Sequence, residues 1–284
     1  MIALRRRPLL SFVVLSVGLA ACSSQPRPAQ RPSAGADVTD PSAERQPGYL
    51  AREVLPDSQA LLPPPPAAGS PGFALDEQVN REGRALLDTP RGHQATLDAE
   101  LSFPAAAGTY ACALGVPVTR ADTPRLYLLL QRTRTDAGRS VTRAKEHYQR
   151  ARPFMVNGGP TCAPEDEDGL RKNGSYPSGH TAIGWAWALT LAEVAPDRAD
   201  AVLARGRAYA ESRLVCNVHW QSDILEGRFM AAGTVARLHA SAQYRADVAA
   251  ARQEVADARA RGLKPDRDCA AEAEALKLRP ASAL

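Results

Sequence analysis

Two basic side chains stand at a defined spacing in the segment KEHYQRARP, residues 145–153. Lys145 and Arg152 are seven residues apart, so on one helix they would share a face two turns apart. Arginine offers a planar fork for two oxygens of an anion, whereas lysine offers a point charge. The alternative is a solvent-exposed basic face, because further arginines lie nearby, namely Arg132, Arg134, Arg139, Arg143 and Arg150.

The segment GSYPSGHT, residues 174–181, predicts a turn that leads into a helix. Pro177 imposes an extended approach, Ser178 can cap the helix, and Gly179 permits close backbone approach. The first amides of a helix favour an anion, and His180 would lie in the first turn beside it. Taken alone, such a turn is more often a simple helix cap.

A histidine and a carboxylate are paired in SRLVCNVHWQSD, residues 212–223. His219 and Asp223 are four residues apart, which predicts one helical face and hydrogen-bond reach. A carboxylate there would fix the imidazole tautomer and stabilise a developing imidazolium. Arg213 reaches the same space only if the chain bends near residues 216–217. The alternative is a helical His–Asp pair of local value.

Each segment alone is weak, but the three in this order are specific. Lys-x6-Arg-Pro, Pro-Ser-Gly-His and Ser-Arg-x5-His-x3-Asp together resemble the signature of the type 2 phosphatidic-acid phosphatase superfamily. The fuller text resembles its soluble bacterial branch, the class A non-specific acid phosphatases. The resemblance extends from about Leu75 to His239, and no motif position departs from it. It implies a single all-α domain of the phosphatase and vanadium haloperoxidase type.

The resemblance also assigns a binding role to five side chains or backbone groups. They would surround a phosphoryl group and are Lys145, Arg152, Ser178, Gly179 and Arg213. Fixed cations around a charged, five-coordinate phosphorus are expected to supply most of the acceleration.

Three further residues would carry the covalent chemistry that the resemblance implies. His219, neutral and oriented by Asp223, would attack phosphorus and form a phosphohistidine. His180, protonated, would give its proton to the leaving alkoxide and then take one from the attacking water. The expected activity is hydrolysis of small phosphate monoesters at acidic pH, and transfer to other alcohols is left open.

This mechanism needs no metal and no cofactor, so EDTA should leave the activity intact. Vanadate should inhibit as a transition-state mimic. Because one histidine must be neutral and the other charged, the rate should follow a bell in pH, with its maximum on the acid side.

Three alternatives remain for the same motifs. A haloperoxidase would hold vanadate as a permanent cofactor, and a lipid phosphate phosphatase would act on membrane substrates. A non-catalytic lipoprotein that binds phosphate is least favoured, because binding an anion requires neither a proton donor nor a nucleophile.

The composition of the 284 residues is that of a globular protein, with 44% hydrophobic and 23% charged residues. The net charge is +4, but three of the basic residues are Arg5, Arg6 and Arg7 near the N-terminus. Charge therefore gives no support to a nucleic-acid partner. Whether the chain forms a homo-oligomer is left open.

Residues 1–22 have the features of a bacterial export signal. Arginines precede an apolar run that is too short to span a bilayer. The run ends in Leu-Ala-Ala-Cys, which resembles the lipobox of lipoproteins and implies lipidation of Cys22. Ser23 after this cysteine favours the periplasmic face of the outer membrane, with the lipid as the sole membrane contact. The alternative is a cleaved signal and a soluble periplasmic protein.

The five cysteines agree with export, because an odd number is awkward in an oxidising compartment. Lipidation of Cys22 leaves four, and the sequence alone allows three connectivities for two disulfides. Given the site that the resemblance implies, we favour Cys162–Cys216, which would join two of its segments. That pairing leaves Cys112–Cys269.

The remaining patterns outline the domains. Eleven of the 23 prolines fall within residues 23–71, which predicts an extended, disordered tether. The helical domain is then expected over residues 72–284, with a helix from Thr123 to about Arg152. Residues 182–192 are apolar almost all round, which predicts a buried helix. Further helices are expected over residues 197–215, 220–239 and 242–261, and strand patterns are nearly absent.

Overall fold

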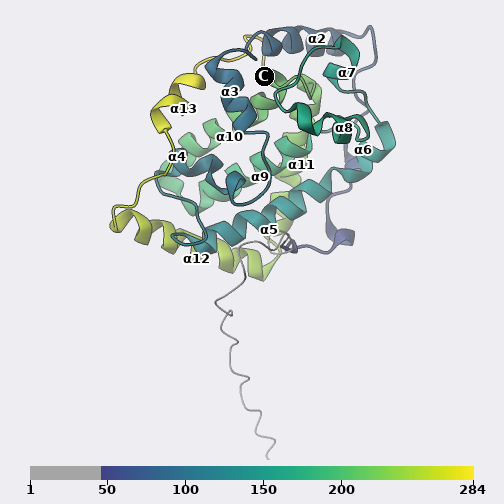
Figure 1. Ribbon diagram of the computed structural model, residues 1–284. Coiled ribbons are helices and arrows are strands. Elements are labelled where there is room, and N and C mark those ends of the chain that lie inside the picture. Colours follow the sequence, from purple (N-terminus) through teal and green to yellow (C-terminus); the bar gives the residue numbers. More distant parts are fainter. Residues whose placement is uncertain (1–45) are drawn as a thin grey trace, which may run out of the picture. The chain divides into compact units, whose positions relative to one another are not determined.

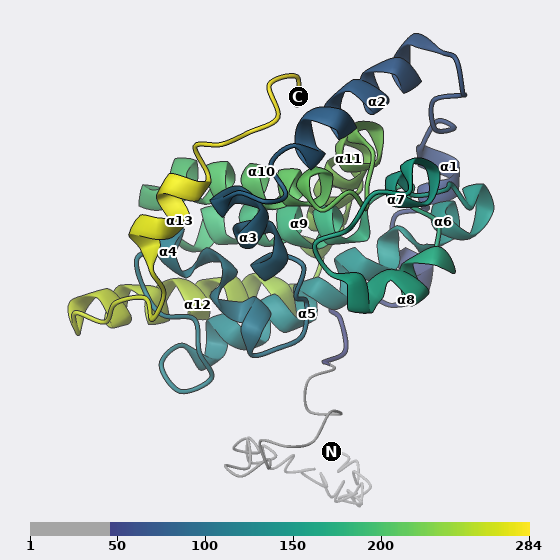
Figure 2. The same cartoon turned by 45° about the horizontal axis from the view of Figure 1, so that its top comes forward.

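The computed structural model describes residues 46–284, and every regular element in that range is helical (Figures 1 and 2). The all-α prediction is therefore confirmed. The α-helices are α1 (Ser58–Leu61), α2 (Pro71–Arg84), α3 (Pro90–Leu97), α4 (Ala111–Leu114), α5 (Pro124–Ser140), α6 (Thr142–Tyr148), α7 (Pro153–Asn157), α8 (Glu167–Arg171), α9 (Gly179–Val194), α10 (Ala199–Val215), α11 (Gln221–Leu238), α12 (Ala242–Ala260) and α13 (Cys269–Ala275). Short 3-10 helices are η2 (Arg52–Val54), η3 (Ala105–Tyr110), η4 (Pro164–Asp166) and η5 (Pro196–Arg198). None of the helices within residues 46–284 is both long enough and apolar enough to cross a bilayer.

Helix α9 is the central element of the fold, and it contacts α5, α10, α11 and α12. Its apolar residues face all sides, as the sequence predicts, because neighbouring helices cover it on all sides. A Cβ on Gly227 of α11 would lie 2.7 Å from the Ser178 carbonyl oxygen, so a glycine lets α11 approach the start of α9 closely. That start is the part of α9 that carries His180.

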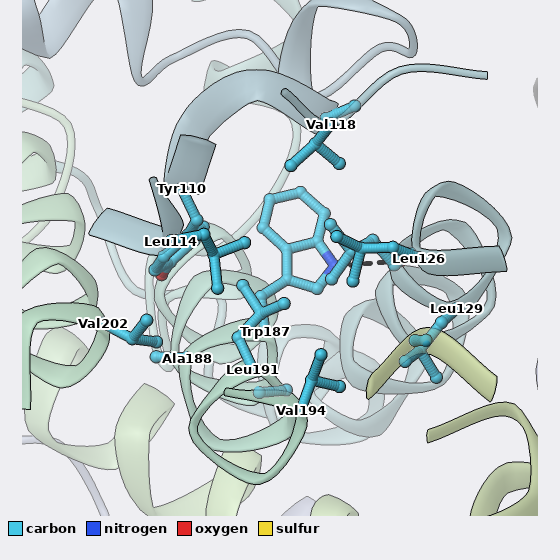
Figure 3. Close-up of a cluster of buried hydrophobic side chains, with 14 of the residues drawn as sticks. Tyr110, Leu114, Val118, Leu126, Leu129, Trp187, Ala188, Leu191, Val194 and Val202 are labelled. Carbon is cyan, nitrogen blue, oxygen red and sulfur yellow. Dashed lines mark hydrogen bonds between the residues drawn. The ribbon is translucent and has the colours of Figure 1, made fainter. Parts of the chain in front are cut away.

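Trp187 occupies the middle of the main hydrophobic cluster (Figure 3). Its ring lies among Leu114, Val118 and Leu126, and its Nε1 donates a 2.9 Å hydrogen bond to the Leu130 carbonyl. The indole is fully buried with its one polar group satisfied. Removing such a side chain typically costs about 3–5 kcal/mol, so this cluster stabilises the helices that position the rest.

Two disulfides fasten loops and short helices to this core. Cys112–Cys269 joins α4 to α13, and Cys162–Cys216 joins the loop before α8 to the end of α10. The favoured pairing is therefore confirmed. The second bridge holds the segment that follows α10, which leads to His219.

The long helix expected from Thr123 to Arg152 is wrong. Helix α5 ends at Ser140, whose hydroxyl donates to the Ala137 carbonyl instead of facing solvent. Such local bonds compete with regular helix geometry. A separate α6 follows and ends at Gln149, which adopts a left-handed conformation with φ of 43°. Lys145 and Arg152 therefore do not share a helical face.

The predicted tether is also wrong over residues 46–71, which pack on the helical domain. The Asp136 carboxylate on α5 accepts hydrogen bonds from the backbone N–H groups of Tyr49 (2.7 Å) and Leu50 (3.3 Å). Further along, the Ser58 hydroxyl accepts from the Ala144 N–H of α6 at 3.0 Å. The high proline content correctly argues against a long helix or a strand here, but it carries no information on tertiary contacts. This segment is ordered because distant residues hold it. We call residues 46–66 the N-terminal arm.

Other expectations concern residues that the structure does not describe. The export signal over residues 1–22, lipidation of Cys22 and the tether over residues 23–45 lie outside the described residues.

The N-terminal arm is expected to stabilise the domain. A chain beginning at Pro63 loses the two donors to buried Asp136 and the bond to Ala144, so it should unfold more easily than a chain beginning at Gln46. The deletion also removes Leu62, which is buried in a cluster with Val141 and Met230. Burying a leucine contributes about 1.5–3 kcal/mol, so we expect a loss of at least about 2 kcal/mol. Urea unfolding followed by circular dichroism measures the difference. Coincident transitions would show that the arm contributes nothing.

Candidate active site

The three chemical segments converge on one cavity of about 450 Å³. Lys145 reaches it from α6, Arg152 from the start of α7, His180 from the first turn of α9, and His219 from the residues before α11. Figures 1 and 2 both show α6, α7 and α8 grouped on one side of α9 and α11. Residues up to 74 positions apart in the sequence, Lys145 and His219, thus line the same cavity.

A sharp bend brings Arg213 and His219 together. Asn217 has a φ of 60°, and its side-chain oxygen accepts hydrogen bonds from the amides of Asn80 and Asn157, each at 2.9 Å. These contacts hold a backbone conformation that asparagine tolerates better than most residues. The bend lies where the sequence required it, near residues 216–217.

His219 and Asp223 meet, although not as helix neighbours. His219 precedes α11, Trp220 caps it, and Asp223 occupies its first turn. Asp223 Oδ2 accepts from His219 Nδ1 at 3.1 Å and from the Trp220 backbone N–H at 2.9 Å. The predicted shared helical face is therefore wrong, and the contact arises because the carboxylate folds back over the helix N-terminus.

The hydrogen bonds of His219 define its tautomer. A carboxylate only accepts, so Nδ1 carries the proton that it donates to Asp223. A guanidinium only donates, and Arg152 Nη1 lies 3.1 Å from Nε2. His219 Nε2 therefore keeps its lone pair, on the side of the ring where Arg152 lies. That is the arrangement of a nitrogen nucleophile beside a cation that binds its target.

Backbone carbonyls fix the two cations that line the cavity. Arg152 Nε donates to the Leu170 and Asn173 carbonyls at 3.0 and 3.1 Å, and Lys145 Nζ donates to the Gly174 carbonyl at 2.6 Å. Burial and the charge of Arg152 lower the pKa of Lys145 to about 7, and burial lowers the pKa of Arg152 to about 10. The one carboxylate that acts on both cations, Asp223, does not offset the effect of burial on their pKa values.

Arg213, which does not line the cavity, adds a third buried positive charge that acts on His180 and His219. Its side chain is 2% exposed, and its Nε has no hydrogen-bond partner among residues 46–284. Burial lowers the pKa of this guanidinium as well. Asp223 is the carboxylate that acts on Lys145 and Arg152, and its oxygens are already occupied. Asp98 and Asp166 act on Arg213, and Asp98 is itself bound by Arg205 and Ser212. The site is therefore built to receive an anion.

The start of α9 presents His180 and the predicted cap. Ser178 Oγ accepts from the Thr181 N–H at 3.2 Å, and the Ser178 N–H donates to the Asp223 carbonyl at 2.9 Å. His180 Nε2 donates to the Ala99 carbonyl at 2.9 Å, which leaves Nδ1 for a ligand. Burial, Arg213 and His219 lower the pKa of His180 well below its usual value, so the free site holds this ring neutral.

Two residues of the site carried no functional signal in the sequence. Arg150, grouped above with solvent-facing arginines, is 9% exposed and donates to Asp223 Oδ1 at 2.6 Å. Asp76 on α2 is 1% exposed and accepts from Arg150 Nη2 at 2.7 Å. Asp76 lies in an amphipathic helix with no motif around it. The one available signal for Arg150 is its position two residues before Arg152, in a segment that Pro153 keeps extended.

Comparisons with known proteins agree with this geometry. The PAP2 superfamily model matches residues 127–247, a range that contains all eight site residues that the sequence predicts. A non-specific acid phosphatase of Providencia stuartii is 46% identical over 209 residues, covering 73% of this chain and 84% of that protein. An acid phosphatase of Zymomonas mobilis is 42% identical, covering 74% of this chain and 80% of that protein. A non-specific acid phosphatase of Salmonella typhimurium is 39% identical, covering 76% and 87%.

The chain belongs to the non-specific acid phosphatases of the PAP2 superfamily. It is therefore an enzyme, a phosphatase, and the resemblance seen in the three motifs is confirmed. Its substrates are phosphate esters, which fits a cavity lined by Lys145 and Arg152.

Replacing Lys145 tests whether the buried positive charge of the site lowers the stability of the fold. Because its pKa is about 7 in the fold and about 10.4 when free, the protonated amine costs stability in full below pH 7, and the cost disappears as pH rises towards 10. In phosphate-free buffer at pH 5, Lys145→Met should therefore raise the free energy of unfolding by roughly 1–3 kcal/mol. Thermal unfolding at pH 5 and pH 9 measures this gain and its decline.

The matched control is Lys172→Met, an exposed lysine on the same cavity. It should change stability by less than about 0.5 kcal/mol at either pH. Inorganic phosphate should stabilise the wild type more than Lys145→Met, since it binds the folded site through that charge. A destabilised Lys145→Met protein at pH 5 would contradict the interpretation.

Proposed function

We propose that the phosphatase hydrolyses small phosphate monoesters at acidic pH, without a metal, through a phosphohistidine on His219. The observation that carries the proposal is the state of that ring. Asp223 holds its Nδ1 proton, and its Nε2 lone pair lies 3.1 Å from the guanidinium of Arg152. A phosphoryl group bound by Arg152 would therefore lie in reach of the nucleophile.

Binding comes from fixed donors around the cavity. Arg152, Lys145 and Arg213 would share the non-bridging oxygens of the phosphoryl group, and the Ser178 hydroxyl and Gly179 N–H would add donors from the start of α9. The carbonyls that now accept from Lys145 and Arg152 keep both cations in place before the ligand arrives. Such preorganised charge stabilises the transition state without reorganisation.

In the first chemical step, His219 Nε2 forms a bond to phosphorus as the bond to the ester oxygen breaks. The departing alkoxide takes a proton from Nδ1 of His180, which has received that proton from the bound substrate monoanion while Nε2 stays bonded to the Ala99 carbonyl. Asp223 accepts from Nδ1 of His219 and stabilises the positive charge that develops on the ring.

The second step reverses these roles. His180 takes a proton from water, whose oxygen attacks phosphorus and breaks the bond to His219 Nε2. Inorganic phosphate leaves as the monoanion with the proton that His180 took up, so both rings return to their neutral starting states. An alcohol in place of water would yield a new phosphate ester, which is the proposed phosphotransferase side activity.

The charges around the two histidines favour an acidic optimum. Burial and then Arg152 lower the pKa of His219 well below its usual value, so the nucleophile stays neutral in mild acid. His180 is neutral in the free site, so the proton for the leaving group must arrive with the substrate. A phosphate monoester has a second pKa of about 6, and its monoanion brings that proton at acidic pH. Activity should fall above this range as the proton is lost.

Three fixed cations also support a metal-independent reaction. A divalent cation would be repelled by Lys145, Arg152 and Arg213, which already supply the positive charge that metals supply elsewhere. Vanadate, which adopts five-coordinate geometry, is proposed as an inhibitor rather than a cofactor.

We also propose that the phosphatase is exported and held on the periplasmic face of the outer membrane by a lipid on Cys22. The two disulfides support an oxidising compartment, since such bridges persist there and are rare in the bacterial cytoplasm. Because they use four cysteines, they leave Cys22 as the remaining thiol of the five.

The phosphohistidine gives the direct test of the mechanism. Wild-type protein mixed with a p-nitrophenyl ester in excess EDTA and quenched in base should contain an acid-labile phosphate on His219, mapped by mass spectrometry. His219→Ala should lose this label and at least about 10³-fold in kcat, because the covalent route is closed.

Histidine outside the site provides the control. His93→Ala, an exposed histidine on α3, should keep both label and rate. Loss of activity in EDTA that added metal restores would contradict the metal-free step. A labelled His180 with an unlabelled His219 would overturn the assigned roles.

Lipidation can be tested separately in an expressing bacterium. Metabolic labelling with radioactive palmitate should mark the wild-type protein and place it in the outer-membrane fraction. Cys22→Ser should lose both the label and the fractionation, because the thiol is the acylated atom. A soluble, unlabelled wild-type protein would refute the anchor.

A further inference from the structure

Arg150 lies directly behind the His219–Asp223 pair. Its guanidinium donates through Nη1 to Asp223 Oδ1 at 2.6 Å and to Ser222 Oγ at 2.8 Å, and through Nη2 to Asp76 Oδ2 at 2.7 Å. The side chain is 9% exposed and bridges two carboxylates that are 0% and 1% exposed. A planar fork can make these bonds at once, which a lysine ammonium cannot do with the same geometry.

Asp76 completes the arrangement from α2. Its Oδ1 accepts from the Ser222 backbone N–H at 2.7 Å, and its Oδ2 accepts from the Ser222 hydroxyl at 2.7 Å. Helix α2, the segment before α7 and the first turn of α11 are thereby tied together. None of these bonds involves a group that lines the cavity.

The contacts of Trp220 hold the same segments against one another. Its Nε1 donates to the Ala151 carbonyl at 2.9 Å, and the Arg150 guanidinium lies 5.4 Å from its ring centroid. The ring of Phe73 on α2 also packs against Trp220, with 5.3 Å between the two ring centroids. Arg150 is therefore held by contacts with an aromatic ring and with two carboxylates.

Each oxygen of Asp223 has a separate task. Oδ2 accepts from His219 Nδ1 and the Trp220 N–H, while Oδ1 accepts from Arg150. Without the bond to Oδ1 the carboxylate could rotate about its terminal bond, and the His219 ring would lose its fixed orientation.

We propose that Arg150 and Asp76 are positioning residues that fix Asp223 and, through it, the nucleophilic nitrogen of His219. This inference rests on the proposed function, because it assumes that His219 is the nucleophile. Arg150 sets the orientation and the charge behind the pair, and Asp76 holds Arg150 and offsets part of its charge.

The charge of Arg150 also acts on the titration of His219. Burial, Arg152, Lys145 and Arg213 are the larger causes that lower the pKa of His219, and Arg150 adds to them. The charged and titratable groups that face the ring are Lys145, Arg150, Arg152, His180, Arg213 and Asp223, and those that face Arg150 are Asp76, Tyr176 and Asp223. Removing the cation should raise the pKa of His219, and removing the charge of Asp76 should lower it.

The experiment compares the pH profile of kcat/KM in three variants. Its acid limb is the fall in kcat/KM at low pH as His219 becomes protonated. In Arg150→Gln the limb should move to higher pH by about one unit, because His219 is protonated more easily. Its kcat should fall about 10-fold to 100-fold, because the carboxylate is no longer held. Arg150→Lys keeps the charge and should keep the limb within about 0.3 units while kcat still falls. Asp76→Asn should move the limb the opposite way, to lower pH.

The matched control is Arg132→Gln, which removes an arginine from a part-buried ion pair with Asp247 between α5 and α12 and should leave the limb in place. Circular dichroism checks each fold. Should Arg150→Gln fail to fold, the direction of the Asp76→Asn shift decides the question. A limb that is unmoved, or that moves the same way in Arg150→Gln and Asp76→Asn, would overturn the inference.

The phosphohistidine on His219 is measured in parallel in the wild type. A labelled wild type with unmoved limbs would reject the positioning role and leave the proposed function standing. An unlabelled wild type would reject the proposed function itself and this inference with it.

Discussion

Positive charge buried without equal negative charge is the constraint on which the rest of this structure depends. Arg213 is 2% exposed with an unpartnered Nε, Arg152 bonds only neutral carbonyls and an imidazole, and the pKa of Lys145 is about 7. Asp223, the carboxylate that acts on Lys145 and Arg152, is committed to His219 and Arg150, and Asp98, which acts on Arg213, is committed to Arg205. Desolvated charges of this kind cost stability unless they are paired. In the proposed function, the bound phosphoryl group supplies the missing negative charge.

The remainder of the fold offsets that cost. Helix α9 is apolar on every side and packed by four longer helices, and Trp187 fills the cluster beside it. The same helix carries Gly179 and His180 in its first turn, so the central helix of the domain also supplies one wall of the site. The Cys162–Cys216 bridge and the asparagine contacts around Asn217 hold the bend that brings His219 back towards Arg213. Stability and site geometry therefore depend on the same few contacts.

The sequence was sufficient for the fold class, the convergence of the three motifs and the membership of the family, and the reasons are physical. Apolar periodicity identifies α9, and the order of motif residues narrows the chemistry. Predictions from the sequence were wrong where contacts with distant residues, rather than the local pattern, determine the conformation. Lys145 and Arg152 suggested one helix, but Gln149 ends α6 in a left-handed conformation. Proline-rich residues 46–66 suggested disorder, but Asp136 and Ala144 hold them from far along the chain. Arg150 looked like one surface arginine among several because nothing local marks a buried partner on α2.

The charges around the site also hold the pKa of His219, the proposed nucleophile, below its usual value. An ordinary histidine beside a buried carboxylate would gain a proton more readily, since Asp223 stabilises the imidazolium. Here burial and four neighbouring cations outweigh that carboxylate, and the pKa of His219 falls well below its usual value. Asp223 can therefore orient the ring and stabilise charge that develops during the reaction without protonating the ring beforehand. Under the proposed function, binding and nucleophilicity are two effects of one distribution of charge, and an acidic optimum is the expected consequence.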